Sequence, residues 1–358
     1  MAMASTHNSP SDGPVFVVGS MGSGTTITRL MLDSHPNLMI ARETGFMRAA
    51  NAQYNIPFWQ FGDVWLDRIG MSESELDTAI RQFYNDVFGT AAAKQGAKRW
   101  GDKTPFHVHH MERAARIFPD ARFVATVRHP GAVTNSVKRF GWVWNTGIRT
   151  WLNSNQAMID AGMALGDRFH LIRYEDLVTD TEPIMREVLD FLDEPWAEQV
   201  LNYHDVQSGR AEGGTRAEEP VDTKRISRWT ENVTPQQMER LVARTNDLAR
   251  LFGYDSANPE PVGPLNPDND GYFGLTGTAL ARRYQEVAPA HVDFELGFEN
   301  RLYTQQSLAQ ELQQANVAGY DARPIRLPYQ NMISGREPKR SFSARARRRI
   351  ARSLDPDR

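Results

Sequence analysis

The 358-residue chain has no cysteine, which excludes disulfides and thiolate metal sites. No apolar run approaches the roughly 18 residues that a membrane-spanning helix needs, so we expect no transmembrane segment. Residues 1–14 are polar and lack the apolar stretch of a secretory signal. We therefore expect a disordered leader there and a cytoplasmic protein.

The chain also lacks a large excess of one charge sign, because 41 basic and 44 acidic residues give a formal net charge of only −3. The basic residues are unevenly spread, however: residues 336–358 hold nine basic and three acidic side chains. A solvated tail is the simpler interpretation, since no aromatic residues alternate with the arginines. The alternative is a contact for an anionic partner such as a lipid surface, a nucleic acid or an acidic protein.

A lysine is missing from a glycine-rich segment. Residues 19–26 read Gly-Ser-Met-Gly-Ser-Gly-Thr-Thr, which is the frame of a phosphate-binding loop. In loops that hydrolyse nucleotides, a lysine follows the last glycine and reaches the β and γ phosphates; Thr25 stands here instead. Backbone N–H groups at a helix N-terminus can still surround a phosphate. We therefore expect a nucleotide donor other than ATP.

The loop lies in an alternating pattern of strands and helices. A β-branched and aromatic run at 15–18 precedes it, and an amphipathic segment at 27–34 follows. Further strands are predicted at 123–127 and 169–173. Helices are predicted at 72–90, 108–118, 146–165 and 182–192. The expected fold is α/β of the P-loop type, with three layers and a mainly parallel central sheet between helices.

In such a sheet the ligand lies at the carboxyl ends of the strands. Arg128 follows the strand at 123–127, and Ser136 lies eight residues later on the next helix. A forked cation and a hydroxyl can together hold a phosphate. The strand at 169–173 is followed by Tyr-Glu-Asp at 174–176. The sequence thus predicts a donor with two separate phosphate groups.

Four ordered motifs together resemble the sulfotransferases that use 3'-phosphoadenosine 5'-phosphosulfate (PAPS). They are the loop at 19–26, Arg128 with Ser136, Tyr-Glu-Asp-Leu at 174–177, and Ile-Ser-Arg-Trp at 226–229. The segments Asp-Ser-His-Pro at 33–36, Gly-Asp-Lys-Thr-Pro at 101–105 and Leu-Phe-Gly-Tyr-Asp at 251–255 are similar to the bacterial and tyrosylprotein-type branches. The resemblance covers residues 15–261.

The resemblance implies roles for donor-binding residues. The 5'-phosphosulfate would be held by the loop positions Gly22, Ser23, Gly24, Thr25 and Thr26. The 3'-phosphate would be held by Arg128 and Ser136. Tyr174 matches an aromatic residue near the adenine, and Ser227 with Arg228 matches an element that closes over the nucleotide. The alternatives are a core tyrosine for Tyr174 and an ordinary exposed charge for Arg228.

The resemblance also implies the catalytic residues. Glu43 is similar to the catalytic glutamate of the tyrosylprotein-type enzymes, so we expect it to act as general base. Lys103 would stabilise the transferring sulfonate. A surface ion pair of Arg42 with Glu43 is the alternative for the glutamate. The histidines at 107, 109 and 110 offer another base, but no compact pattern with a carboxylate accompanies them, and we expect no metal.

One departure from the family pattern concerns Gly22, where relatives usually carry arginine or lysine. Three explanations stay open: another cation such as Lys103, Arg42 or Arg48 compensates, the loop binds a modified donor, or catalysis has been lost. A small-molecule kinase with a P-loop is the alternative of a different class. The missing lysine at Thr25 and the pair of Arg128 with Ser136 disfavour it.

The acceptor is the least constrained part of the prediction. The aromatic residues of 51–70, together with Trp142, Trp144 and Trp151, line an acceptor pocket or pack the core. The hydroxyl or amine acceptor is accordingly a small molecule, a glycan, a lipid or a peptide. We expect a flexible loop at 208–223, a sulfotransferase-like domain at 15–261, an extension at 262–335 on the core or on a second copy in a homodimer, and a basic tail at 336–358.

Overall fold

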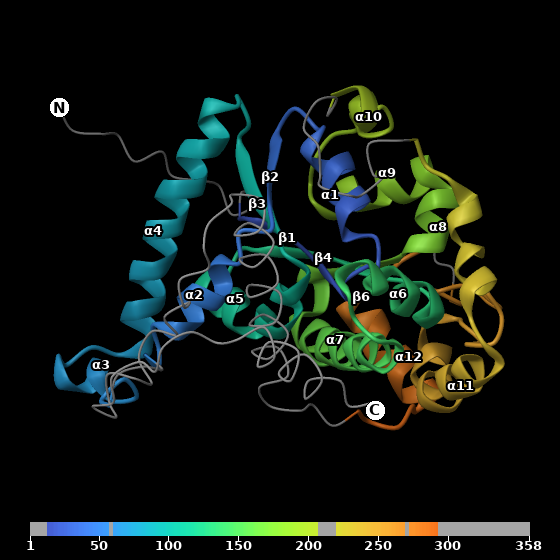
Figure 1. Ribbon diagram of the computed structural model, residues 1–358. Coiled ribbons are helices and arrows are strands. Elements are labelled where there is room, and N and C mark those ends of the chain that lie inside the picture. The colour runs from blue at the N-terminus through green and yellow to red at the C-terminus, as the bar shows by residue number, and fades with distance from the viewer. Residues whose placement is uncertain (1–12, 57–59, 207–219, 269–271, 293–358) are drawn as a thin grey trace, which may run out of the picture. The chain divides into compact units, whose positions relative to one another are not determined.

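A computed structural model of the chain describes residues 13–56, 60–206, 220–268 and 272–292. Apart from Gln60 they belong to one compact unit. Its centre is a six-stranded sheet in the order β2-β3-β1-β4-β5-β6 (Figure 1), in which only β6 is antiparallel to its neighbour. The strands are β1 (Val15–Gly19), β2 (Leu38–Arg42), β3 (Arg99–Lys103), β4 (Arg122–Val127), β5 (Phe169–Arg173) and β6 (Leu275–Thr276).

Helices cover both faces of the sheet (Figure 1). They are α1 (Thr25–Asp33), α2 (Phe46–Ala52), α3 (Trp65–Arg68), α4 (Glu73–Lys94), α5 (Met111–Ile117), α6 (Pro130–Ser136), α7 (Trp144–Leu165), α8 (Tyr174–Thr179), α9 (Thr181–Phe191), α10 (Tyr203–Val206), α11 (Pro235–Ala249) and α12 (Gly277–Val287). Short 3-10 turns are η1 (Pro105–His110), η2 (Val137–Phe140), η3 (Gly166–Arg168), η4 (Glu198–Val200), η5 (Thr223–Arg225), η6 (Arg228–Asn232) and η7 (Arg250–Phe252).

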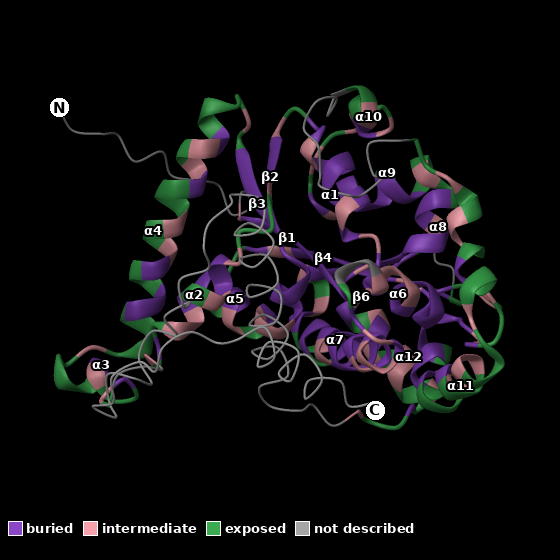
Figure 2. Cartoon of the chain, viewed as in Figure 1, coloured by how far each residue is buried: buried purple, intermediate pink, exposed green. Residues whose placement is uncertain are grey.

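The strand β1 shows how the core is divided. Its side chains alternate between the two faces: Phe16 and Val18 join one hydrophobic cluster, with α4, α5, α7 and α12, and Val15 and Val17 join another, with α1, α8 and α9. Every residue of β1 is buried (Figure 2). A strand buried on both faces is typical of a parallel sheet covered by helices. The predicted α/β architecture is confirmed.

Three strands had no counterpart in the sequence prediction: the short β6, and β2 and β3, which bear on the site. β3 reads Arg-Trp-Gly-Asp-Lys and lacks the apolar run that identified β1, whereas the apolar run Leu-Met-Ile-Ala of β2 was not assigned to a strand. Both are parallel strands of the central sheet, and all five residues of β3 are buried. The consequence for function is direct, because Glu43 follows β2 and Lys103 is the last residue of β3. The sequence prediction did not place Lys103 on a strand.

Two apolar residues of helix α4 lie outside the core, since Phe83 is 60% exposed and Val87 is 47% exposed. The buried stripe instead follows a spacing of four through Leu76 and Ile80 to Phe88. Helix α5 begins at Met111 rather than at residue 108, because Pro105–His110 forms the 3-10 turn η1.

The compact unit continues past Pro261. β6 pairs antiparallel with β5, and Leu280 of α12 is buried in the same cluster as α7. The described residues up to Val292 belong to this unit, so the expected boundary at 261 falls inside it. The leader up to residue 12, most of the loop at 208–223, the second half of the extension and the basic tail lie outside the described residues. Within the described residues, no helix combines the length and apolarity needed to span a membrane.

Candidate functional site

The carboxyl ends of the parallel strands bring the predicted residues to one edge of the sheet. The strand register aligns Lys103 with Val17 of β1 and with Arg42 of β2, and aligns Gly19 with Thr126 of β4. Residues from five strand ends therefore meet there. They are the loop after Gly19, Glu43 after β2, Lys103 in β3, Arg128 after β4 and Tyr174 after β5.

The glycine-rich loop is fixed to the sheet through Ser23. Its hydroxyl forms a 2.9 Å hydrogen bond with the Thr126 hydroxyl, and its N–H donates to the carbonyl of Ser20 at 3.0 Å. Gly19 permits this contact, because a Cβ there would lie 2.4 Å from the Thr126 carbonyl oxygen. The fully buried Ser23 side chain contributes to the shape of the loop, and its expected contact with the phosphosulfate stays a prediction.

The end of the loop presents an N-terminus that an anion can use. Gly24 caps α1 with φ 108° and no side chain caps the helix, which leaves N–H groups of its first turn, around Thr25 and Thr26, available to a ligand. The Ser20 hydroxyl is buried without a hydrogen-bond partner. Burying a polar group without a hydrogen-bond partner costs free energy, and a hydrogen bond from a bound ligand offsets that cost. The loop therefore fits the phosphate end of a nucleotide.

Gly22 lies directly against Ser136. Its φ is 87°, and a Cβ there would be 3.0 Å from Ser136 Oγ and 3.1 Å from Ser136 Cβ. A residue with a side chain would be strained at this φ, and Ser136 would have to shift by a few tenths of an ångström to admit its Cβ. Glycine therefore fits the close approach of the two elements that were predicted to hold the two phosphates.

Arg128 connects the loop to a distant segment. Its guanidinium donates to the carbonyls of Gly22 at 3.3 Å and Arg225 at 2.9 Å. It also stacks 4.0 Å from the centre of the Tyr174 ring. Its buried Nε–H has no partner. Arg128 and Ser136 therefore both border Gly22, and Arg128 retains a donor for an anion.

The Tyr174 ring packs against the Arg128 guanidinium. The side chain is only 5% exposed. A Cβ on Gly24 would lie 2.5 Å from its ring, so the tyrosine fills the space between the loop and the Arg128 guanidinium. Such a cation–π contact favours one orientation of the arginine. Little of the ring is left exposed for an adenine, and that expected contact stays a prediction.

Lys103 links the loop to Glu43. Its Nζ lies 2.6 Å from Glu43 Oε1 and donates to Thr26 Oγ1 at 3.3 Å. The lysine side chain is completely buried, whereas the Glu43 side chain is 51% exposed. Glu43 has φ 38°, which is unusual for a residue with a side chain, and its N–H donates to the Lys103 carbonyl at 2.7 Å. A strained residue held by its neighbours is a frequent feature of functional sites.

Asp102 lies on the opposite side of β3 from Lys103. The fully buried carboxylate accepts hydrogen bonds from the hydroxyls of Thr44 and Thr104, both at 2.7 Å. His107 Nδ1 lies 3.1 Å from it. Burial alone would raise the pKa of Asp102, but His107 and the two hydroxyls together hold it below its usual value. His107 is therefore part of a buried network, which gives it no access to a substrate as base.

The segment around residue 227 is attached to the site by backbone and ring contacts. The Trp229 ring stacks on His129, with centroids 4.8 Å apart, and it lies against Gly131, where a Cβ would fall 2.4 Å from the ring. Ser227 and Arg228 are exposed, and Arg228 pairs with Asp222 at 3.3 Å. The roles given to their side chains stay predictions.

Sequence reasoning missed several residues that shape the site. Thr126, Thr44 and the Arg225 carbonyl act through partners far away in the chain, so no local pattern indicates them. Asp102 combines local partners, Thr104 and His107, with the distant Thr44. Gly-Asp-Lys-Thr-Pro at 101–105 was the one available signal for Asp102. The tryptophans at 142, 144 and 151 are buried, and the last two lie in the main core cluster, which favours the packing interpretation over an acceptor pocket.

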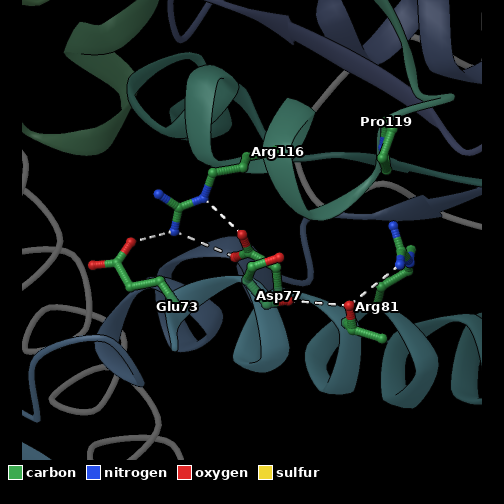
Figure 3. A pocket seen from close by; sticks show the side chains of 7 residues that line it. Glu73, Asp77, Arg81, Arg116 and Pro119 are labelled. Carbon is green, nitrogen blue, oxygen red and sulfur yellow. Dashed lines mark hydrogen bonds and ion pairs between the residues drawn. The ribbon is translucent and has the colours of Figure 1, made fainter. Parts of the chain in front are cut away.

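A hollow of about 430 Å³ lies elsewhere, between α4 and α5 (Figure 3). Its lining is Glu73, Ser74, Asp77, Thr78, Arg81, Arg116 and Pro119. In Figure 3 the Arg116 guanidinium lies between the carboxylates of Glu73 and Asp77, at 2.7 Å from each. None of the predicted site residues lines this hollow. The chemistry suggested by the sequence therefore belongs to the sheet edge.

Comparison with known proteins agrees with this geometry. The model of the "Sulfotransferase family" matches residues 14–198. Protein-tyrosine sulfotransferase 1 of Danio rerio is 28% identical over 276 residues, which are 71% of this chain and 76% of the relative. The enzyme of the same name from Mus musculus is 29% identical over 283 residues, 71% of this chain and 73% of the relative.

A solved structure supports the fold. The sulfotransferase domain of the Synechococcus PCC 7002 olefin synthase covers 68% of this chain and 94% of its own, with a TM-score of 0.51 and 23% identity. The family match covers more than half of the chain and includes the loop, Glu43, Lys103 and Arg128. The chain belongs to the sulfotransferase family.

Proposed function

We propose that this sulfotransferase transfers the sulfuryl group of PAPS to the hydroxyl of a tyrosine in a protein or peptide. One observation carries the proposal: the buried Lys103 ammonium lies between the Glu43 carboxylate and the Thr26 hydroxyl of the loop. A base for the acceptor, a cation for the transferred group and the anion-binding loop are thus within hydrogen-bond reach of one side chain.

The donor fits the charges along the sheet edge. The N-terminus of α1 would hold the 5'-phosphosulfate, with Thr25 and Thr26 in its first turn. Arg128 and Ser136, on the other side of Gly22, would hold the 3'-phosphate through the free Nε–H and the hydroxyl. Because Gly22 separates the two, a nucleotide with phosphates at both ends of its ribose matches the arrangement.

Transfer would proceed in line. The acceptor oxygen attacks the sulfur while the bond from sulfur to the 5'-phosphate oxygen breaks, and that oxygen leaves with the electron pair. The acceptor proton passes to the Glu43 carboxylate. Lys103 stabilises the negative charge that develops around the sulfonate and on the leaving phosphate. The products are a sulfate ester and adenosine 3',5'-bisphosphate.

Two observations support a protein tyrosine as acceptor. The matched relatives are named protein-tyrosine sulfotransferases, and the Glu43 side chain is half exposed at the edge of the sheet, where a side chain of another protein can reach it. A phenol with a pKa of about 10 also loses its proton to a carboxylate more readily than an alkyl alcohol does. A small alcohol, a glycan or a lipid would be the competing acceptor.

Calorimetry tests the donor. Adenosine 3',5'-bisphosphate should bind without added metal and more tightly than ATP with magnesium, because the site offers two phosphate positions. Preference for ATP would contradict the proposal.

Radiolabelled PAPS tests the acceptor. A peptide with one tyrosine should become labelled, and the same peptide with phenylalanine in its place should not. Labelling of sugars or lipids in place of the tyrosine peptide would support sulfotransferase activity but contradict a protein tyrosine as the acceptor.

A further inference from the structure

The segment after Glu43 is held by acceptors that come almost entirely from β3 and the turn that follows it. The N–H of Thr44 donates to Asp102 Oδ2 at 3.4 Å, and the N–H of Gly45 donates to Thr104 Oγ1 at 3.2 Å. The N–H of Met47 donates to His107 Nε2 at 3.4 Å. Successive backbone donors thus end on side chains of one short stretch, residues 102–107.

Asp102 is the centre of these contacts. It accepts from both threonine hydroxyls and lies beside His107 Nδ1, so each group that accepts a backbone N–H from the segment is itself oriented by this carboxylate. The Thr44 hydroxyl accepts in turn from the N–H of Phe46 at 3.4 Å. These are the donors at the start of α2, for which Gly45 provides no side-chain cap.

The hydrogen bonds that hold residues 44–47 constrain Glu43 through the backbone. Glu43 has φ 38°, a conformation that is strained in a residue with a side chain and persists only where the surroundings impose it. The Lys103 carbonyl fixes its N–H from one side, and the Asp102 network fixes the next residue from the other. Lys103 and Asp102 are neighbours on β3 with side chains on opposite faces.

We propose that Asp102 is a positioning residue for Glu43: by holding residues 44–47 it imposes the left-handed turn at Glu43 and so directs the Glu43 carboxylate toward Lys103. Asp102 touches neither donor nor acceptor in this arrangement. The inference rests on the proposed function, in which Glu43 is the general base.

A double-mutant cycle tests this directly. Asp102→Asn should lower kcat roughly 10- to 100-fold, since a misplaced catalytic group has effects of that size. The KM for PAPS and the affinity for adenosine 3',5'-bisphosphate should change by no more than about twofold, because the loop is untouched. In a Glu43→Gln background the same substitution should cause no further loss of kcat, since it acts through Glu43.

The matched control is Asp33→Asn. Asp33 accepts from the N–H of Ile40 at 2.7 Å and pairs with Arg29, so it also anchors β2 but not residues 44–47. It should leave kcat unchanged. Thr44→Val removes the hydroxyl that donates to Asp102 and accepts from the N–H of Phe46, so it should act in the same direction as Asp102→Asn but more weakly. The cycle can be run with Thr44→Val if Asp102→Asn does not fold.

Amide hydrogen exchange separates this proposal from the proposed function. Exchange at residues 44–47 should accelerate roughly tenfold or more in Asp102→Asn, and not in Asp33→Asn, whether or not the protein turns over PAPS. A wild-type protein without sulfotransferase activity would reject the function alone. Unchanged exchange at 44–47, or losses of kcat that add in the double variant, would overturn the role of Asp102.

Discussion

At the scale of single residues, the site is defined by a few close contacts around Gly22. Arg128 donates to its carbonyl, and Ser136 Oγ lies 3.0 Å from the position that a Cβ on Gly22 would take. The sequence predicted Arg128 and Ser136 as partners but left the glycine as an anomaly. In the structure α6 closely approaches this glycine, and the Lys103 ammonium lies 3.3 Å from the Thr26 hydroxyl of the loop. That Lys103 compensates for the missing side chain stays a prediction.

Arg128→Ala should weaken the binding of adenosine 3',5'-bisphosphate by about 2 kcal/mol, because a charge-assisted contact with phosphate is lost. Calorimetry measures the change. Arg186→Ala is the matched control, since Arg186 pairs with Glu182 on the surface of α9 and should leave the affinity unaltered. Equal affinity in the two variants would remove Arg128 from the donor site.

Gly22→Ala should lower both stability and affinity for the bisphosphate. Gly96→Ala separates the two effects, because Gly96 also has a positive φ, 77°, but has no atom within 4 Å of its Cβ position. Both variants should lose about 1 kcal/mol of unfolding free energy to backbone strain. Only Gly22→Ala should lose affinity in calorimetry; similar affinity in both would contradict the packing of Ser136 against the loop.

At the scale of elements, the parts recognised from sequence are those with local patterns. β1, β5 and α7 showed apolar periodicity, and their predicted bounds agree closely with the structure. β3 did not, because Asp102 and Lys103 near its carboxyl end are charged, whereas β2 was missed although its Leu-Met-Ile-Ala run is apolar. The exposed Phe83 shows that apolar character alone does not place a residue in the core.

Trp229 of η6 packs against Gly131 of α6, and a substitution at Gly131 tests this contact. Gly131→Ala should push Trp229 away and shift the Arg225 carbonyl that accepts from Arg128. We expect a lower melting temperature and a several-fold loss of bisphosphate affinity. Gly89→Ala in α4 is the control, since open space surrounds that position; alanine there should stabilise the helix slightly. Unchanged bisphosphate affinity in Gly131→Ala would show that the segment around Trp229 does not contribute to the donor site.

At the scale of the whole molecule, partners distant in sequence determine what the sequence could not show. Glu175 is an example: it accepts from the Tyr254 hydroxyl at 2.6 Å and from the N–H of His129 at 3.1 Å, and burial raises its pKa. Neither partner could be assigned from a local pattern. The donor, the acceptor and a cytoplasmic location stay predictions, whereas family and fold are established.

The pH dependence of stability should carry a contribution from His129. Burial, opposed by the Asp255 carbonyl and reinforced by Arg128, lowers its pKa to about 4. The unfolded chain binds a proton near pH 6.5 and the folded one only near 4, so stability is lost as the pH falls between these values. Glu175, with a raised pKa, acts in the opposite direction.

Urea unfolding of the wild type and of His129→Asn measures this contribution. The wild type should lose on the order of 3 kcal/mol more unfolding free energy than His129→Asn between pH 7 and pH 4, so the difference in unfolding free energy between the two proteins should narrow. His291→Asn, at an exposed position, should follow the wild type. A constant difference for His129→Asn would show that His129 does not stay neutral in the fold.

The central claim is that Glu43 serves as base beside Lys103 at a loop that binds PAPS. Single-turnover transfer from radiolabelled PAPS to a tyrosine peptide, compared between wild type and Glu43→Gln, tests it most directly. Donor affinity should be retained while the rate falls by roughly two to four orders of magnitude. Transfer at the wild-type rate by Glu43→Gln would contradict the account.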